Sequence, residues 1–263
     1  MKYLLTLLSL CLLSTFGHTQ KTDSATIIEP ILLDKAMLSG LNLKPVTSPT
    51  QPERRLFQKR LFRGKEIAVY VVSSETAEAD WNNYSIDEFI YVLNGRARLH
   101  PRNDAERFYY PGDFFFAPKG YTGIWETQGG AEFYHELSVI ALDRPKEKVD
   151  SLQQPTLLDK AKLAGRGITP KKENKESYHD VLVEGTELDV HLEGEKGSKK
   201  EITTPLKEQL IYIIAGTLSL TPKGGVTRTF YTGDFLVLPD GFIGQWESKG
   251  HNLFRSLRVY KAN

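Results

Sequence analysis

Residues 112–120 of the chain read Gly-Asp-Phe-Phe-Phe-Ala-Pro-Lys-Gly, and residues 233–241 read Gly-Asp-Phe-Leu-Val-Leu-Pro-Asp-Gly. Each stretch places four apolar residues between a Gly-Asp turn and a Pro-x-Gly turn, a pattern that predicts a short buried strand. The two stretches belong to a longer match, in which residues 64–126 align without gaps with residues 185–247 and 18 of the 63 aligned pairs are identical. Such internal similarity indicates two copies of one domain.

Two further features of each copy indicate its fold class. The β-branched and aromatic runs Phe89–Leu93 and Leu210–Ile214 predict strands with two apolar faces, one filling a barrel and the other packing on a second sheet. Helical signals are confined to Leu-Leu-Asp-Lys-Ala segments at residues 32–36 and 157–161, each followed by a glycine that stops the helix. Many short strands with frequent turns predict an all-β fold of small barrels with short helical segments.

The composition excludes several classes of protein. The 263 residues are 40 % hydrophobic and 25 % charged, which is typical of folded globular chains. With 34 basic and 33 acidic residues, the formal charge of +1 argues against a nucleic-acid partner, since such proteins concentrate basic charge. A single cysteine cannot form an internal disulfide or a multi-cysteine metal site.

The first residues of the chain have the pattern of a secretory signal. Met1 and Lys2 precede an apolar run from Leu4 to Leu13, and small residues and then charged residues follow. The run is too short to span a bilayer, so we expect no membrane attachment once residues 1–19 are removed. We therefore expect a secreted or periplasmic protein.

Removal of this segment changes the chain that folds. Lys2 and Cys11 are lost with it, and the mature chain has no thiol and a formal charge of zero. We expect the first domain at residues 20–145 and the second at residues 146–263, joined by a polar linker near residues 143–154. Without disulfides, these domains must be stabilised by their cores.

The turns and the residues before them resemble the two sequence patterns of the cupins, which are small double-sheet jelly-roll barrels. One pattern is Glu, six residues and Gly, which Glu88 and Gly95 match and Gln209 and Gly216 echo. The other is Gly, five residues and Pro-x-Gly, which both of the nine-residue stretches match. The resemblance covers nearly the whole mature chain and implies two tandem cupin barrels, each a double-stranded β-helix.

Tryptophans narrow this resemblance to a subfamily. Trp81 before the first pattern, and the pairs Trp125-Glu126 and Trp246-Glu247 after the second, resemble the ureidoglycine aminohydrolase-type cupins. The metal ligands of that aminohydrolase, a glutamate, histidines and a glutamine, are not reproduced in order. The resemblance therefore implies the fold and does not carry over the activity.

The chain departs from metal-binding cupins, which place a His-x-His pair ahead of the glutamate and a third His after Pro-x-Gly. The corresponding positions hold other residue types: Asn82, Tyr84 and Gly123 in the first copy, and Thr203, Pro205 and Gly244 in the second. A first-row metal site normally needs three or more imidazole, carboxylate or thiolate ligands. We therefore predict no cofactor; a divalent metal is possible but the motif does not support it.

Glu88 is the first candidate functional residue. If it points into the barrel as the family's glutamate does, it is a buried carboxylate that must be paired or shifted in pKa. It could bind a ligand, or act as a general base with Tyr84. The alternatives are a structural carboxylate bonded to a neighbouring tyrosine and a solvated residue at the start of a strand beside Asp87. Trp81 and Asn82 would suit a small polar ligand in a cavity, although Trp81 also fits plain core packing.

The second copy offers two other sets of residues. Gln209 and Gln245 are candidate ligand-binding amides. Asp189, His191 and Glu193 alternate along one expected strand, so all three can share a face, and their mostly apolar counterparts in the first copy hint that this face is inward. A displaced metal site or acid–base site is one interpretation of this strand, and a solvated charged face is the other.

These observations leave three hypotheses for function. The first is an exported bicupin that binds a small polar ligand (a sugar, a sugar acid or a ureide-like compound) in the first barrel without the usual metal. The second is an enzyme of the aminohydrolase, isomerase or lyase type that uses Glu88 with Tyr84 or the Asp189 to Glu193 strand. The third is an interaction module whose paired barrels form a homodimer.

Overall fold

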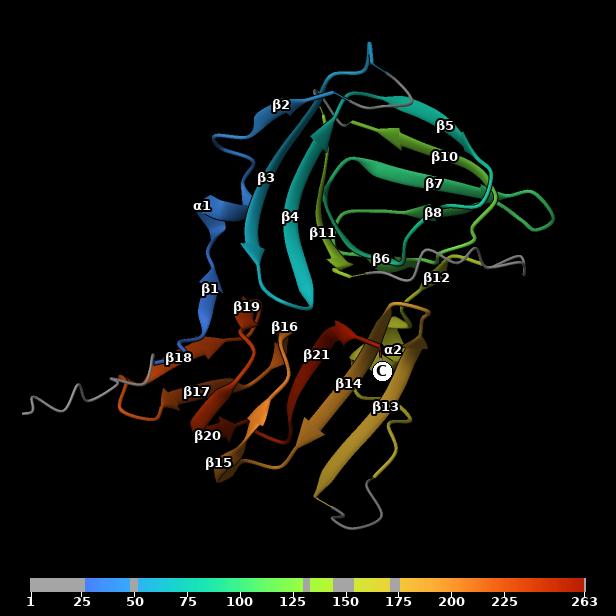
Figure 1. Cartoon of the computed structure of the whole chain (residues 1–263). Coiled ribbons are helices and arrows are strands. Elements are labelled where there is room, and N and C mark those ends of the chain that lie inside the picture. The colour runs from blue at the N-terminus through green and yellow to red at the C-terminus, as the bar shows by residue number, and fades with distance from the viewer. Residues whose placement is uncertain (1–26, 48–51, 130–132, 144–153, 171–175, 263) are drawn as a thin grey trace, which may run out of the picture.

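The computed structural model describes residues 27–47, 52–129, 133–143, 154–170 and 176–262, and most of them lie in β-strands (Figure 1). The expected signal segment at residues 1–19 lies outside the described residues. The same is true of the expected domain boundary at residues 145 and 146.

The first copy forms a barrel from two facing sheets. A seven-stranded sheet has the order β12-β9-β6-β11-β4-β3-β2, and a four-stranded sheet has the order β5-β10-β7-β8. The strands are β2 (Lys44–Val46), β3 (Leu56–Arg63), β4 (Ile67–Ser74), β5 (Ala77–Trp81), β6 (Glu88–Asn94), β7 (Arg96–Pro101), β8 (Arg107–Tyr109), β9 (Phe114–Ala117), β10 (Gly123–Gln128), β11 (Tyr134–Ala141) and β12 (Thr156–Leu157).

The second copy repeats this arrangement with a six-stranded sheet, β1-β19-β16-β21-β14-β13, and a four-stranded sheet, β15-β20-β17-β18. Its strands are β1 (Ile31–Leu33), β13 (Ser177–Glu184), β14 (Leu188–Glu195), β15 (Ser198–Leu206), β16 (Gln209–Ala215), β17 (Thr217–Pro222), β18 (Arg228–Tyr231), β19 (Phe235–Leu238), β20 (Phe242–Lys249) and β21 (Phe254–Lys261). The two tandem cupin barrels expected from the sequence are therefore present.

The strands predicted from the glycine-bounded apolar runs are β6, β9, β16 and β19. In the two large sheets β6 and β16 are third and β9 and β19 are second, so each has a strand on both sides. β6 pairs with β9 from Glu88 opposite Ala117 to Tyr91 opposite Phe114. Phe115 faces the interior of the first barrel, whereas its neighbours Phe114 and Phe116 belong to a different buried cluster. Both faces of the strand are apolar because both are covered by protein.

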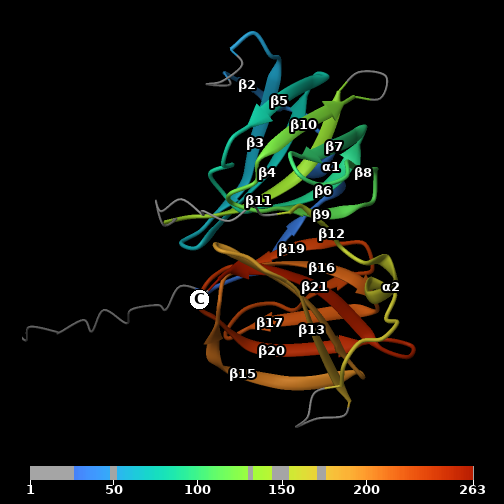
Figure 2. The ribbon, with the colours of Figure 1, turned by 90° about the vertical axis from the view of Figure 1, so that its right-hand side faces the viewer.

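That other cluster lies between the two barrels. The seven-stranded and six-stranded sheets place their outer faces against each other, as the two views show (Figures 1 and 2). Tyr91 packs against Tyr212 and Phe235 of the second copy, with ring centroids 6.2 and 5.2 Å apart. This layer is a sandwich of two sheets, and the barrel interiors lie on either side of it.

Each copy contributes one short strand to the other copy's sheet. β1, at the start of the described chain, pairs with β19 of the second barrel, and β12 pairs with β9 of the first. Both strands come from the repeated Leu-Leu-Asp-Lys-Ala segments. The sequence did not predict this exchange. It connects the barrels, because each large sheet ends in a strand that comes from the other copy.

The same segments contain the two predicted helices, α1 (Lys35–Leu38) and α2 (Lys160–Leu163). Asp34 and Asp159 accept hydrogen bonds from backbone N–H groups of the first turn, which is the expected N-cap arrangement. Gly40 and Gly165 follow the helices with φ angles of 78° and 89°, which glycine adopts without strain. Among the described residues, no helix is long and apolar enough to cross a membrane.

Two buried carboxylates connect the barrels at the turns of their β-hairpins. Glu208, just before β16, accepts hydrogen bonds from the backbone N–H groups of residues 65, 66 and 67 at 3.1, 3.0 and 2.7 Å. Asp87, at the matching position before β6, accepts from the N–H groups of Glu187 and Leu188 in the second copy and from Lys119 in its own. Each copy therefore binds the hairpin turn of the other through the same position.

A glycine in each hairpin turn makes room for the carboxylate of the opposite barrel. A Cβ atom on Gly64 would lie 1.7 Å from a carboxylate oxygen of Glu208, and one on Gly185 would lie 2.5 Å from Asp87. Lys119 adds a buried ion pair to Glu187 at 2.9 Å across the interface. The backbone approaches the carboxylates so closely that only glycine fits.

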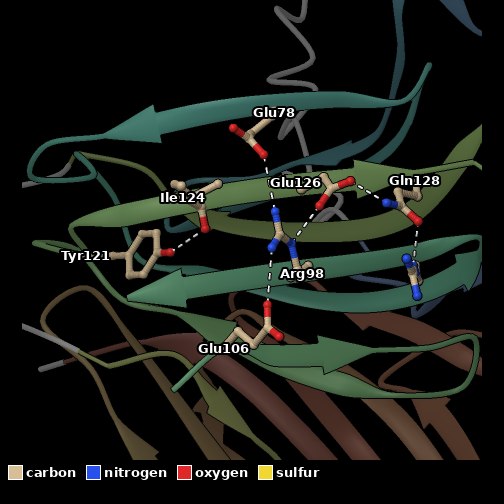
Figure 3. Close-up of polar contacts among 8 residues, drawn as sticks. Glu78, Arg98, Glu106, Tyr121, Ile124, Glu126 and Gln128 are labelled. Carbon is tan, nitrogen blue, oxygen red and sulfur yellow. Dashed lines mark hydrogen bonds and ion pairs between the residues drawn. The ribbon is translucent and has the colours of Figure 1, made fainter. Parts of the chain in front are cut away.

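The outer face of the β5-β10-β7-β8 sheet is polar, in contrast to its inner face. Arg98 on β7 lies at the centre of a cross-strand network with Glu126 at 2.6 Å and with Glu78 and Glu106 at 3.2 Å (Figure 3). Gln128 donates a hydrogen bond to Glu126 in the same row. Polar outward side chains that alternate with apolar inward ones are expected for an antiparallel sheet with one solvated face. A cavity that binds a ligand is therefore expected on the inner face.

We expect Glu208→Gln to destabilise the protein. The glutamine amide would place a donor against backbone N–H donors, leaving buried groups unsatisfied at a cost of about 2–3 kcal/mol. Chemical denaturation measures the free energy of unfolding. Glu201→Gln, at an exposed position of β15, is the matched control and should stay within about 0.5 kcal/mol of the wild type. Equal stability of the two variants would contradict the role given to Glu208.

Candidate functional site

The first barrel encloses a cavity of about 240 Å³ between its two sheets. Its volume is below that of pockets for drug-sized ligands, so it suits a small molecule. Polar and apolar side chains from both sheets and from the adjoining loops line it: Arg54, Leu56, Gln58, Val72, Ser74, Ala79, Trp81, Tyr84, Glu88, Trp125, Thr127, Tyr134 and Glu136.

Glu88 begins β6 and points into this cavity, which is one of the orientations that the sequence left open. Its exposed fraction is 9 %. The Tyr84 hydroxyl donates a 2.6 Å hydrogen bond to one carboxylate oxygen, and the Ser138 hydroxyl on the neighbouring strand β11 donates to the other. Tyr84 and Glu88, which the sequence paired as candidate catalytic residues, are therefore in direct contact. Hydrogen bonds to both oxygens fix the orientation of the carboxylate.

A second carboxyl group, Glu136 on β11, shares the cavity with Glu88. The Tyr134 hydroxyl donates a 2.6 Å hydrogen bond to it. Burial, followed by the negative charge of Glu88, raises the pKa of Glu136. Burial, with the same two carboxylates nearby, also raises the pKa of Tyr134. The cavity therefore holds two coupled carboxyl groups, of which Glu136 retains a proton above the usual range for glutamate.

Arg54 brings the opposite charge to the cavity. Its guanidinium donates hydrogen bonds to the Ser74 and Thr127 hydroxyls at 2.6 and 2.9 Å. These contacts hold the cation among the lining residues with Glu88 and Glu136. The cavity thus offers hydrogen-bond acceptors from the carboxylates and a planar cationic donor from Arg54.

Aromatic rings form the apolar part of the lining. Trp81 and Tyr84 meet edge to face with ring centroids 4.9 Å apart, and Tyr84 meets Trp125 at 5.4 Å. Trp81 was predicted either as a ligand contact or as core, and it is half-buried and borders the cavity. Rings of this kind present flat apolar faces or edges to the carbon skeleton of a ligand.

The remaining predicted ligand-binding residues lie elsewhere. Asn82 is exposed and is not among the cavity-lining residues, because the chain turns between β5 and β6 at Asn83, whose φ is 66°. Gln209 is buried at the start of β16 in the second barrel, and its amide donates to the Lys207 carbonyl at 3.1 Å. Gln245 is exposed because its neighbour Trp246 takes the inward position on β20. The structure therefore does not support Gln245 as a cavity amide.

The metal of the cupin fold does not fit the first barrel. Among the four positions of the family's ligands, Asn82 points to solvent and the Tyr84 hydroxyl is bonded to Glu88. Gly123 has a φ of 150°, and a Cβ atom there would lie 2.3 Å from the His100 carbonyl oxygen and 2.9 Å from the Tyr121 hydroxyl, so no side chain can replace the missing histidine. Glu88 alone is too small a ligand set.

The same positions in the second barrel fit no better. Thr203 and Pro205 are exposed, and a Cβ atom on Gly244 would lie 2.1 Å from the Thr221 carbonyl oxygen. Trp246 is almost fully buried in this barrel and donates to Glu195 at 2.8 Å. We conclude that neither copy provides the family's usual metal ligands.

The strand predicted to carry Asp189, His191 and Glu193 is β14. These residues alternate with the buried Leu188, Val190 and Leu192. Leu188 and Val190 belong to the layer between the barrels, so the three polar side chains face the opposite side, the interior of the second barrel. His191 and Glu193 lie together with His179 of β13, whereas Asp189 is not part of that group. Burial raises the pKa of Asp189, which lies at the turn end of the strand.

Arg54, Tyr134, Glu136 and His179 are the functional candidates that sequence reasoning missed. For Glu136 a signal existed, since it is a single charged residue in the otherwise uncharged stretch from Glu136 to Ala141 that forms most of β11. Arg54 and His179 carried no such signal. They reach their sites only because β3 and β13 fold back onto β4 and β14.

The pKa of Glu136 predicts a change in the pH dependence of stability. A carboxyl group whose pKa is raised by folding binds a proton in the native state that the unfolded chain releases, so the free energy of unfolding falls as pH rises above about 5. We expect Glu136→Gln to remove on the order of 1 kcal/mol or more of this decline between pH 5 and pH 8. Denaturation at several pH values measures it, with Glu201→Gln as control. An unchanged pH slope in Glu136→Gln would contradict the burial of a protonated carboxyl.

The chain is similar to known proteins both in sequence and in fold. The family model of the EutQ-like cupin domain matches the chain twice, at residues 63–131 and 187–256. No curated protein matches the sequence.

Several solved structures share the fold. A protein of unknown function from Pseudomonas syringae pv. tomato, of the DUF861 family, has a TM-score of 0.63 and 20 % identity over 89 % of this chain and 99 % of its own. Salicylate 1,2-dioxygenase from Pseudaminobacter salicylatoxidans has a TM-score of 0.57 and 12 % identity over 89 % of this chain and 84 % of its own. A putative glyoxylate-induced protein from Pseudomonas aeruginosa has a TM-score of 0.53 and 15 % identity over 79 % and 80 %.

Structural matches at identities this low establish a common fold, and they do not establish a common activity. The two family matches carry more weight, because together they span more than half of the chain and fall on the two barrels. The chain is a tandem duplication that belongs to the EutQ-like cupin domain family.

Proposed function

We propose that this protein is an exported binding protein for a small sugar acid or ureide-like acid, held in the first barrel without the usual cupin metal. The single observation that carries the proposal is the placement of Glu88 and Glu136 with Arg54 in one aromatic-lined cavity of about 240 Å³. The choice of ligand follows from the chemistry of these three groups.

The two carboxyl groups favour a ligand rich in hydrogen-bond donors. Glu88 accepts hydrogen bonds from Tyr84 and Ser138, and its carboxylate borders the cavity as an acceptor for a ligand hydroxyl or amide N–H. Sugars and ureides carry several such donors on a compact skeleton. The raised pKa of Glu136 means that the cavity accommodates two neighbouring carboxyl groups with less than two full negative charges.

Arg54 favours a ligand that also carries an acid group. A guanidinium binds a carboxylate through parallel hydrogen bonds, which a neutral sugar cannot reproduce. Trp81 and Trp125 then offer apolar surface to the carbon skeleton. A hydroxylated or ureide acid therefore satisfies every class of group in the lining.

An enzymatic alternative of the aminohydrolase, isomerase or lyase type is favoured by one observation. Glu88 and Glu136 share one cavity, and burial and the charge of Glu88 raise the pKa of Glu136, so Glu136 can serve as a general acid beside Glu88 as a general base. In that case Glu88 would accept a proton from the ligand, with Tyr84 orienting it, and Glu136 would donate one. Resemblance to the ureidoglycine aminohydrolase-type cupins makes ureides suitable first substrates.

A ligand screen tests the proposal. We expect glucuronate or allantoate to raise the melting temperature by several degrees, while galactose, which lacks the acid group, has a smaller effect. Glu88→Gln should weaken binding at least about tenfold by calorimetry, and Arg54→Met should abolish the preference for acids over galactose. Glu201→Gln should bind as the wild type does. Equal responses to acids and neutral sugars in the wild type would contradict the role of Arg54.

The same samples separate binding from catalysis. Release of ammonia or formation of a new product, lost in Glu136→Gln while binding persists, would establish the enzymatic alternative. Unchanged ligand recovered after long incubation would support a binding protein. The absence of a response to sugars, sugar acids and ureides alike would overturn both.

Export rests on the apolar run from Leu4 to Leu13 and is tested separately. We expect a Gram-negative host that expresses the full chain to accumulate a product shortened by about 19 residues in the periplasm or medium. Mass spectrometry measures the new N-terminus. A double change, Leu7→Arg with Leu8→Arg, should leave the full-length chain inside the cell. A full-length wild-type product in the cytoplasm would show that residues 1–19 are not a signal.

A further inference from the structure

We propose that the second barrel binds one divalent transition-metal ion of the Zn²⁺ class through His179, His191 and Glu193. This site is independent of the ligand cavity in the first barrel. It also uses none of the positions that the cupin patterns assign to metal ligands, which in this copy are Thr203, Pro205, Gln209 and Gly244.

The three residues come together on one face of two paired strands. His179 of β13 lies directly opposite Glu193 of β14, and His191 is two residues before Glu193 on the same face. Donor atoms of all three side chains lie within 4.8 Å of one another. His179 Nε2 is 2.8 Å from His191 Nδ1 and 3.8 Å from a carboxylate oxygen of Glu193.

These separations match those of ligands around one ion. Two ligand atoms that each lie about 2.1 Å from a metal are about 3.0–3.4 Å apart in octahedral or tetrahedral geometry. The observed 2.8 and 3.8 Å bracket that range, so small side-chain rotations suffice to place an ion between them. Two imidazoles and one carboxylate form a recurrent set for zinc and iron, with one or more positions open to water or substrate.

The neighbouring residues can orient the three proposed ligands and leave them accessible to an ion from solvent. Tyr260 on β21 lies with its hydroxyl 3.0 Å from His191 Nε2, the ring nitrogen other than the Nδ1 that faces His179, so it can orient the imidazole. The side chains of His179 and Glu193 are 32 % and 22 % exposed, so an ion from solvent can reach them.

A small polar cavity adjoins the proposed site. It has a volume of about 170 Å³ and is lined by Glu193 and by Ser177, Glu195, Lys200 and Arg258. Glu193 belongs both to this cavity and to the metal-binding group. A molecule in the cavity, next to Lys200 and Arg258, could therefore reach an open coordination position of the ion.

Comparison with the first copy shows that packing does not require these residues. The positions that match His179, His191 and Glu193 hold Gln58, Tyr70 and Val72, in the same strand register. The first barrel is complete without two imidazoles and a carboxylate on this face. Their presence in the second copy alone points to a function gained after the duplication.

The competing explanation is an ion pair between His179 and Glu193 that needs no metal. Metal titration distinguishes the two. Protein without an affinity tag is stripped with EDTA, dialysed, and titrated with ZnCl₂ by calorimetry, and the visible spectrum is recorded after loading with Co²⁺. We expect one Zn²⁺ per chain and ligand-field absorption of bound Co²⁺.

Variants locate the ion. His179→Gln introduces the residue of the first copy, so it should fold normally, and we expect it and His191→Ala to lower Zn²⁺ affinity by at least about 100-fold. His251→Ala, at an exposed histidine of the same barrel, is the matched control and should bind Zn²⁺ as the wild type does. Circular dichroism with EDTA present verifies the fold of each variant.

Two outcomes would overturn the site: a wild type that binds no stoichiometric Zn²⁺, or a folded His179→Gln variant that binds it unchanged. Glu88→Gln separates this site from the cavity of the first barrel. Unchanged Zn²⁺ binding in Glu88→Gln supports the second barrel as its location, and loss of binding in that variant would instead place the ion at Glu88. Failure of the ligand screen would leave the metal result unaffected.

Discussion

The carboxylates of Asp87 and Glu208 bind the hairpin turns of the opposite barrel, and the rest of the structure depends on this reciprocal contact. A buried carboxylate is stable only when its oxygens are hydrogen-bonded, and here backbone N–H groups supply those bonds. The bonds bring the seven-stranded and six-stranded sheets face to face over a continuous apolar layer. β1 and β12 extend that layer by crossing to the other barrel's sheet. The two copies are consequently one folding unit with two interiors.

This arrangement explains how the interiors could diverge. The outer faces of the large sheets are buried in the interface, so substitutions there destabilise the protein. Positions that face a barrel interior can change independently in each copy. The first barrel has Glu88 and Glu136 in a small cavity with Arg54. The second has Gln209 and Ser256 at the matching positions, and Trp246 lies between Glu195 and Arg258 in its interior. Its distinctive polar group is instead the cluster of His179, His191 and Glu193, on strands where the first barrel has none of these residue types.

Local patterns in the sequence predicted the strands and helices well, for identifiable reasons. Four apolar residues between a Gly-Asp turn and a Pro-x-Gly turn are typical of a short strand buried on both faces, which is what β9 and β19 are. Asp34 and Asp159 cap α1 and α2 because the capping contact spans two or three residues. The contact of Tyr84 with Glu88 was one of the alternatives that the sequence left open, and these residues lie only four positions apart. The strand exchange had no local signal, because Leu32 and Leu157 look alike whichever sheet they join.

The sequence by itself determined the duplication, the cupin barrels and the loss of the family's histidines, because these depend on residue type and short-range spacing. The inward orientation of Glu88 was one of the interpretations left open, and the structure decided it. Only the tertiary structure decided which distant side chains meet. Arg54 and Glu136 join Glu88, and His179 replaces Asp189 beside His191 and Glu193, through strand pairings that bring together residues far apart in the chain. The same pairings set the pKa of Glu136, since burial and the charge of Glu88 act through space and not along the sequence.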